Sequence, residues 1–556
     1  MAAQFTQHAD FESKGEKSLA TQRFKILNSI LSAYKRGPFT VKTPVLATTA
    51  FILITAQSSG FSQTLPDLGT QAGDAKSQNA QGLSIQQAIQ NALTQNPMMQ
   101  QSQAMIDEAK GAIKEASGNR LPQLDLSFGG VASNNALNVF GMKLNQGQAT
   151  FNDFGVQQFF QEAGPTFSNL PGASSNPPDS LNHPGWHHNF QTSLKLSVPI
   201  YNGGKISGMK SRAEALLRAA QSGDRAAKQQ LILQVVTAYA GIDAAHAFVK
   251  VTQQAVEAAK SYRDLSNKMY LQGVVSKSDL LKSEVNLGDI QLRHQQALDQ
   301  LADAKDGLHI VMGVPRNQQF EINELIHINK LSGTLEEARN LALRNNPQIL
   351  AIDQQIDAAR SGVSSARSVY KPHVNLMAQQ DWNSENLGIK NDSYTVGAVL
   401  NWKILDFGAR SGQVDRAVAG LNATRSKQQM AINTLMSQVG KTWRAAQLAE
   451  NRLDLKKLAI SQSEEATRLE KLRYAQGIST MTNLLQTQAE LDKSRAEFVQ
   501  AQYELILQRA TLLLTTGQLE PDAISATPLT TQSSLPSARR SAYAQPAVVS
   551  VSKVPQ

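Results

Sequence analysis

The chain has 556 residues, no cysteine, 18% charged and 6% aromatic residues, and a formal net charge of +9 at pH 7. The missing cysteine excludes disulfides, thiolate metal sites and cysteine nucleophiles, and we expect no lipid-anchored N-terminal cysteine. Lys and Arg are scattered among Asp and Glu, and no basic stripe with interleaved aromatic residues occurs, so we expect no nucleic-acid partner.

Residues 1–62 are predicted to be an extended N-terminal region that contains a secretory signal. The apolar run Val45–Ala56 follows a basic segment and is too short to span a bilayer as a helix. We expect cleavage between Ala56 and Gln63, with Ser62 as a candidate. The polar stretch before the run is unusual for a signal, and a translation start at Val41 is one explanation.

Two parts of the remaining sequence occur twice. Asn96-Pro97 returns 250 positions later as Asn346-Pro347, and Tyr270-x-x-Gly273 returns 204 positions later as Tyr474-x-x-Gly477. The chain is therefore predicted to be a tandem duplication, in which the first copy carries 46 extra residues between Pro122 and Ile200.

The expected segments follow from this duplication. They are a flexible N-terminal segment at 63–82, repeat 1 at 83–313, a linker or equatorial segment at 314–332, repeat 2 at 333–517 and a disordered C-terminal tail at 518–556. The tail is rich in Ser, Pro and Ala, a composition typical of disorder.

Each repeat begins with a capping box, at Ser84 and Thr334, and the Asn-Pro pair then ends one helix and begins the next. After Pro122 and Pro372 the period changes from helical to alternating. Strands are expected at about 122–131 and 190–201 in repeat 1, and at about 372–380 and 393–404 in repeat 2. Their length and alternation suit strands that cross a bilayer, although alternation alone fits an amphipathic hairpin on a soluble core equally well.

A tight turn after each second strand leads into a long helical pattern, at about 205–270 and 408–474. Return helices are expected at about 277–312 and 479–516. The helix from 205 to 270 would be about 99 Å long, which nearly equals the return helix and the Asn-Pro helix laid end to end. We therefore expect one long helix beside two stacked shorter ones in each repeat. Four strands per chain leave unpaired edges, so three copies with twelve strands are expected around a polar lumen.

Residues 83–517 resemble the outer membrane efflux protein (TolC) family. The resemblance rests on the duplicated Asn-Pro helix start, the hairpin that ends in Ile-Tyr-Asn-Gly-Gly or Ile-Leu-Asp-Phe-Gly, and the two Tyr-x-x-Gly turns. It implies an all-α periplasmic coiled-coil tunnel plus a transmembrane β-barrel, built by a homotrimer as twelve helices and twelve strands. It also implies a location in the outer membrane and periplasm, and partnership with a periplasmic adaptor and an inner-membrane RND or ABC transporter in efflux or type I secretion.

The resemblance places Tyr270, Gly273, Tyr474 and Gly477 at a periplasmic tip where the adaptor makes contact. A tyrosine at a helix end is also common as simple packing, and the glycines serve the turn itself. Trp402, at a strand end, is expected to be an interfacial aromatic residue of the barrel.

Family members often carry acidic residues six and nine positions beyond the second turn glycine, where they narrow the closed tunnel. The equivalent positions here are Asn483 and Gln486, and counting from the first turn glycine gives Asp279 and Lys282. Our hypothesis is that uncharged hydrogen bonds, with a contribution from Asp279, hold the closed tip.

We expect neither enzymatic activity nor a cofactor, because no catalytic triad, phosphate loop or metal-ligand spacing occurs. His183, His187 and His188 cluster in the first hairpin loop without a carboxylate or fourth ligand, so no metal site is predicted. That loop, with its turn-forming run from 176 to 188, is expected outside the cell. The main hypothesis is a passive exit duct, and the alternative is a non-channel periplasmic coiled-coil spacer or adaptor.

Overall fold

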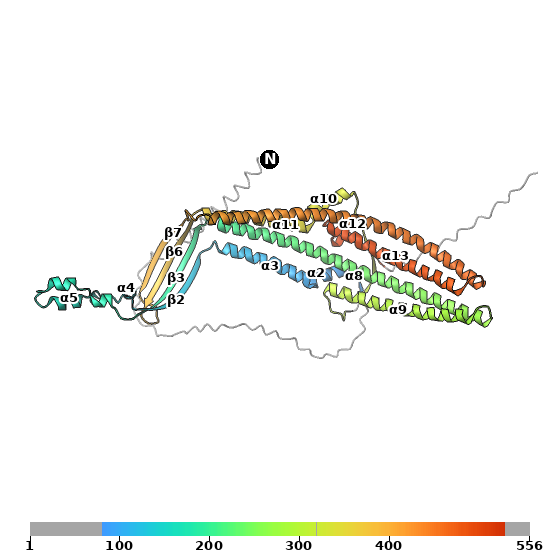
Figure 1. Cartoon of the computed structure of the whole chain (residues 1–556), viewed down its shortest axis with the longest axis horizontal. Coiled ribbons are helices and arrows are strands. Elements are labelled where there is room, and N and C mark those ends of the chain that lie inside the picture. The colour runs from blue at the N-terminus through green and yellow to red at the C-terminus, as the bar shows by residue number, and fades with distance from the viewer. Residues whose placement is uncertain (1–80, 319, 529–556) are drawn as a thin grey trace, which may run out of the picture. The chain divides into compact units, whose positions relative to one another are not determined.

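The structure is a computed structural model that describes residues 81–318 and 320–528. The predicted signal sequence and start, most of the flexible segment at 63–82, and the tail from 529 onward lie outside the described residues. Figure 1 shows the described elements coloured along the chain.

The Asn-Pro motif joins three helices in each repeat. Asn96 ends α2 (Ile85–Gln95) and caps α3 (Pro97–Gly118), while its side-chain amide donates to the Val311 carbonyl at 2.8 Å, in the last turn of α9 (Lys277–Met312). Asn346 does the same between α10 (Leu335–Asn345) and α11 (Pro347–Arg367), and donates to the Thr515 carbonyl at 3.1 Å in α13 (Met481–Thr515). One asparagine thus satisfies the ends of two helices in each repeat.

A glycine makes each of these junctions possible. Gly517 has φ +72°, and a Cβ there would lie 2.5 Å from the Asn345 carbonyl oxygen. Gly313 has φ +71° and would place a Cβ 2.9 Å from the backbone of Asn96. The duplicated glycine therefore serves both the left-handed turn and the close approach of two helix ends.

The two long helices each pack along shorter ones. The helix α8 (Lys205–Leu271) packs along α3, α9 and α11, and α12 (Ala409–Ala475) packs along α11 and α13. Figure 1 shows α3 and α9 following one another beside α8. Among the described residues, α8 is the one helix with a stretch apolar enough to cross a membrane by length and composition, and 33% of that stretch is buried.

The largest hydrophobic core lies where the short helices meet near the middle of α8. It includes Leu231, Val235, Tyr239 and Ile242 of α8, all fully buried. Tyr239 donates a hydrogen bond to the Leu83 carbonyl at 2.8 Å, which ties the start of repeat 1 to this core.

Small strands complete this core and correct one expectation. The expected linker at 314–332 contains β4 (Phe320–Ile322), parallel to β1 (Gln81–Leu83), and β5 (Glu324–Ile328). The strand β8 (Ile524–Pro528) pairs antiparallel with β5, so disorder from residue 518 is wrong for 518–528. The physical reason is that β5 supplies backbone partners and Ile524 is 4% exposed in the core.

Four strands form one antiparallel sheet in the order β2-β3-β6-β7. They are β2 (Gln123–Ser133), β3 (His187–Tyr201), β6 (His373–Ser384) and β7 (Asp392–Asn401). Odd-numbered residues pair with odd-numbered residues across all three ladders, up to an irregularity at Pro199. Odd positions therefore share one face of the sheet and even positions the other.

The two faces differ in chemistry. The odd face carries mostly polar side chains, for example Gln123, Asp125, Ser127, Asn189, Gln191, Ser193, Lys195, Asn375, Gln379, Asp381 and Thr395. The even face is mostly apolar, for example Leu124, Leu126, Phe128, Phe190, Leu194, Leu196, Val198, Val374, Leu376, Val396, Ala398 and Leu400. A sheet with these two faces is suited to lie between water and an apolar phase.

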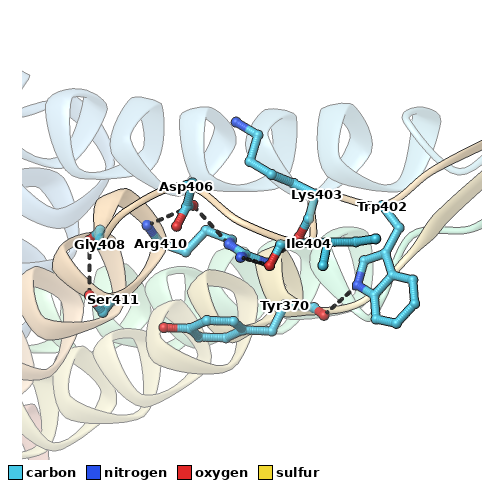
Figure 2. Close-up of polar contacts among 8 residues, drawn as sticks. All are labelled: Tyr370, Trp402, Lys403, Ile404, Asp406, Gly408, Arg410 and Ser411. Atoms are coloured by element: carbon cyan, nitrogen blue, oxygen red, sulfur yellow. Dashed lines mark hydrogen bonds and ion pairs between the residues drawn. The ribbon is translucent and has the colours of Figure 1, made fainter.

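The strand expected at 393–404 ends earlier, at Asn401, which pairs with His373, the first residue of β6. Arg410 binds the segment that follows (Figure 2). The Arg410 guanidinium donates to the carbonyls of Lys403 and Ile404 and to the Asp406 carboxylate, and it lies 5.4 Å from the ring centroid of Tyr370. These bonds take up carbonyls that a strand would use in its ladder.

The first hairpin loop is also different from the expected turn-forming run. It contains α4 (Ala136–Asn145), η1 (Phe151–Phe154), α5 (Val156–Ala163), α6 (Leu170–Ser175) and α7 (Asp179–Asn182). His187 and His188, expected in the loop, belong to β3. We call residues 134–186 the hairpin module.

Candidate functional site at the helical turns

Two turns of the same construction connect the long helices to their return helices. In the first, Gly273 has φ +75°, its amide donates to the Tyr270 carbonyl, and the Val274 amide donates to the Met269 carbonyl, both at 2.9 Å. In the second, Gly477 has φ +72° and makes the same bond to Tyr474. Both are Schellman motifs, in which a left-handed glycine lets the last carbonyls of a helix find donors.

The return helices begin with side-chain caps. Ser276 accepts from the Asp279 amide at 3.3 Å, and its hydroxyl donates to the Asp279 carboxylate at 3.0 Å. Thr480 accepts from the Asn483 amide at 3.3 Å. Asp279 and Asn483 thus have a local structural role at the third position of their helices.

The two tyrosines of the duplicated motif differ in environment. Tyr270 is 37% exposed, whereas Tyr474 is 1% exposed and packs against α8. In this conformation the Tyr474 side chain is not available to a partner, and the sequence motif does not show this difference. The turns instead expose apolar residues that the sequence analysis did not single out, namely Leu271, Val274 and Ile478.

A small hydrophobic cluster joins the two repeats here. It consists of Tyr262 and Met269 from α8, Tyr474 from α12, and Met481 and Leu484 from α13. Met481 and Leu484 are fully buried. The cluster holds the end of α12 and the start of α13 against α8, so we call it the tip cluster.

A buried hydrogen-bonded chain extends the tip cluster. The Tyr262 hydroxyl donates to Gln488 Oε1 at 2.7 Å, and Gln488 Nε2 donates to Asp492 Oδ1 at 2.9 Å. Burial raises the pKa of Tyr262 to about 12, with the nearby Asp492 charge adding to the rise and Arg495 opposing it. Burial also raises the pKa of Asp492, against the Gln488 hydrogen bond and the charges of Arg495 and Arg293.

The hydroxyls of Tyr474 and Ser266 are buried and have no hydrogen bond of ordinary geometry. Burial raises the pKa of Tyr474, the neighbouring Ser266 hydroxyl opposes that rise, and the Asp279 charge adds to it. A buried hydroxyl without a partner costs about 1–3 kcal/mol, so this part of the tip is less favourable than its hydrophobic surroundings.

The four gate candidates, Asp279, Lys282, Asn483 and Gln486, make few hydrogen bonds from one repeat to the other. Lys282 lies 3.8 Å from Asp279 and donates to the Thr482 hydroxyl of α13 at 3.4 Å. Asn483 and Gln486 bond within their own repeat, to Ser479 and Glu490, both at 3.4 Å. Lys282 is therefore the one of the four that reaches the other repeat.

The sequence and the fold both resemble those of known proteins. The family model described as outer membrane efflux protein matches residues 163–314 and 338–518, more than half of the chain. The alkaline protease secretion protein AprF of Pseudomonas aeruginosa is 20% identical over 60% of this chain and 71% of its own length. The outer membrane protein TolC of Vibrio cholerae is 30% identical over 33% of this chain and 42% of its own.

Among solved structures, the outer membrane protein VceC of Vibrio cholerae superposes with a TM-score of 0.61. The superposition covers 78% of this chain and 96% of VceC at 18% sequence identity. This likeness shows a common fold.

Proposed function

Because this chain belongs to the outer membrane efflux protein family, we propose that it is the outer-membrane exit duct of a tripartite efflux or type I secretion system. Substrate passes from a periplasmic adaptor and an inner-membrane RND or ABC pump through a water-filled tunnel. The duct is passive, so the pump selects the cargo.

The observation that carries this proposal is the two-faced sheet. Its even face is mostly apolar along the four strands, and its odd face is mostly polar. The strands β2 and β7 each pair on one side only within the protomer. Lipid cannot satisfy the free N–H and C=O groups of an edge strand. Pairing of β7 with β2 of a second copy removes both edges, and three copies give twelve strands with the odd face inward.

The segment after β7 fits the membrane boundary of such a barrel. Trp402, Ile404, Leu405 and Phe407 are 55%, 77%, 70% and 94% exposed. Arg410 binds the backbone carbonyls of Lys403 and Ile404 in the same segment (Figure 2). Exposed aromatic and apolar side chains beside a cationic residue are typical of the zone between lipid and water. A periplasmic spacer without a barrel would leave these side chains and the even face in water, so the duct is favoured over that alternative.

The tip is the proposed gate. The tip cluster holds the two helical pairs of one protomer together, and Asp279, Lys282, Asn483 and Gln486 lie close to the turns, where three copies would converge. Adaptor contact is assigned to Tyr270, Gly273 and Gly477 with the exposed Leu271, Val274 and Ile478. Contact there opens the tunnel by separating α12 and α13 from α8, which would also expose Tyr474.

The test is single-channel conductance of the purified, detergent-extracted protein in planar bilayers, with the oligomer mass measured in parallel. Small, discrete and stable conductances from a trimer are expected for a duct with its tip closed. A protein that stays soluble without detergent and never inserts would refute the duct.

A further inference from the structure

The hairpin module has a folded interior of its own. Val139 and Ala163 are buried, and the rings of Phe140 and Phe154 meet edge to face at 4.9 Å. Lys143 and Asp153 form an ion pair at 2.6 Å whose side chains are 27% and 17% exposed. The module therefore keeps a defined form and is not a loose loop.

One residue at the base of the module, Gln146, attaches it to the sheet. Gln146 is 2% exposed and caps the end of α4. Its amide nitrogen donates to Asn189 Oδ1 at 3.0 Å and to the His188 carbonyl at 2.7 Å, and its Oε1 lies 2.7 Å from His187 Nε2. The Asn391 amide donates to the Gln146 carbonyl.

The same network reaches the second hairpin. Asn189 Nδ2 donates to Asn383 Oδ1 at 2.9 Å, and Asn391, in the turn between β6 and β7, donates to the Asn383 carbonyl at 3.4 Å. His187, Asn189 and Asn383 are 9%, 8% and 4% exposed. A buried polar network in which each member has a partner holds a single arrangement, because every lost bond leaves a buried group unpaired.

The hydrogen-bonded network lies on one face of the sheet, and this face is the one that the base of the module contacts. His187, Asn189 and Asn383 are all odd-numbered, so their side chains lie on the polar face. Farther along the same face, Gln191 and Lys195 are exposed, and Ser193 between them is 9% exposed beside Asp381. The module base therefore covers the polar face only at the end of the sheet where β2 meets β3, and Figure 1 shows α4 and α5 beyond that end.

We propose that the hairpin module is a size filter at the outer mouth of the duct, held over the lumen by the Gln146 network. This rests on the proposed function, because the polar face is the lumen face only in a closed barrel. Three modules, each based on the inward face, reduce the opening through which substrate leaves.

The absence of native cysteine makes a direct test possible, since any introduced thiol is labelled without background. Ser127→Cys places a thiol on the exposed polar face, Leu126→Cys places one on the apolar face, and Ser168→Cys places one on the module surface. Intact cells are treated from outside with a small methanethiosulfonate or with a bulky polyethylene-glycol maleimide. Ser127→Cys and Leu126→Cys are also made in a chain in which Asn-Gly, a two-residue hairpin turn, replaces residues 134–186. Ser168 lies within the replaced segment, so Ser168→Cys is the accessible control in the full chain only.

The small reagent tests the barrel on which the proposal rests. It is expected to label Ser127→Cys and Ser168→Cys but not Leu126→Cys. Equal labelling of Ser127→Cys and Leu126→Cys would refute the barrel itself, whatever the module does.

The bulky reagent tests the filter. It is expected to label Ser168→Cys, which lies on the module surface. It is expected not to label Ser127→Cys in the full chain, and to label Ser127→Cys when the module is replaced. The same rate of bulky labelling with and without the module, or exclusion in both, would overturn the filter while leaving the barrel intact.

If the shortened chain fails to insert, the small reagent will no longer label Ser127→Cys in it. A point variant then provides the test. Gln146→Ala breaks the attachment and is expected to admit the bulky reagent to Ser127→Cys. Gln148→Ala is the matched control, because Gln148 is exposed and its side chain donates one hydrogen bond, to Glu385 at 3.4 Å. Continued exclusion in Gln146→Ala would overturn the filter.

Discussion

Two tyrosines of the tip cluster provide a sharp test of how the closed tip is held. Both are buried, at 4% exposed for Tyr262 and 1% for Tyr474, and they belong to one hydrophobic cluster. The Tyr262 hydroxyl donates to Gln488 at 2.7 Å, whereas the Tyr474 hydroxyl has no hydrogen bond of ordinary geometry. The same substitution, Tyr to Phe, should therefore have opposite consequences at the two positions.

Tyr262→Phe leaves the buried Gln488 carbonyl oxygen without its donor, at a cost of about 1–3 kcal/mol to the packed tip. If this contact is lost when the tip opens, the ratio of closed to open tips falls by about 5- to 150-fold. Tyr474→Phe removes an unpaired hydroxyl and keeps the ring, so the closed tip should be unchanged or more stable.

The assay is the fraction of time spent in the high-conductance state by single channels in planar bilayers, with both variants compared in the same salt. We expect longer open times for Tyr262→Phe and equal or shorter ones for Tyr474→Phe. Equal open times in the two variants, or longer open times in Tyr474→Phe alone, would refute the conclusion that the Tyr262–Gln488 hydrogen bond stabilises the closed tip.

The remaining predictions concern packing, pH and backbone. Leu484→Ala, at a fully buried position, should destabilise the closed tip by about 2–5 kcal/mol and raise open time, and unchanged open time would exclude the tip cluster as the closing contact. The pKa of Asp492 is raised by burial, so its contribution to tip stability is full below the ordinary aspartate pKa and is lost as the pH rises through the raised value. Acidification should therefore stabilise the closed tip of the parent and lower its open time. The effect should be smaller in Asp492→Asn, which has no carboxyl group to protonate, and equal pH profiles of the two proteins would contradict this. Gly517→Ala should lower the thermal midpoint of the detergent-solubilised protein, because φ is +72° and the Cβ would lie 2.5 Å from a carbonyl oxygen; the left-handed backbone alone costs about 1–2 kcal/mol. Gly420→Ala, in α12 with nothing within 4 Å of a Cβ, is the control and should be neutral or stabilising.

Local chemistry explains what could be predicted from the sequence. The capping boxes at Ser84 and Thr334 form in the structure, because a cap needs only residues three positions apart. The left-handed turns at Gly273 and Gly477 and the odd–even alternation of the strands are equally local. Duplication strengthened each of these signals, since the same pattern occurs twice in one register.

The tertiary structure decided what depends on partners far along the chain. Tyr270 and Tyr474 have the same local motif, yet α8 buries only Tyr474, because the packing of the repeats on each other is not symmetric. The strand β8 forms because β5, nearly 200 residues earlier, offers free backbone groups. The hairpin module is held by a network from Gln146 to Asn383 and Asn391 that no sequence period reveals. Caps, turns and face alternation are determined by the sequence itself because their energies come from neighbours a few residues away. Burial and polar networks were decided by the fold because their energies exist only when distant segments meet.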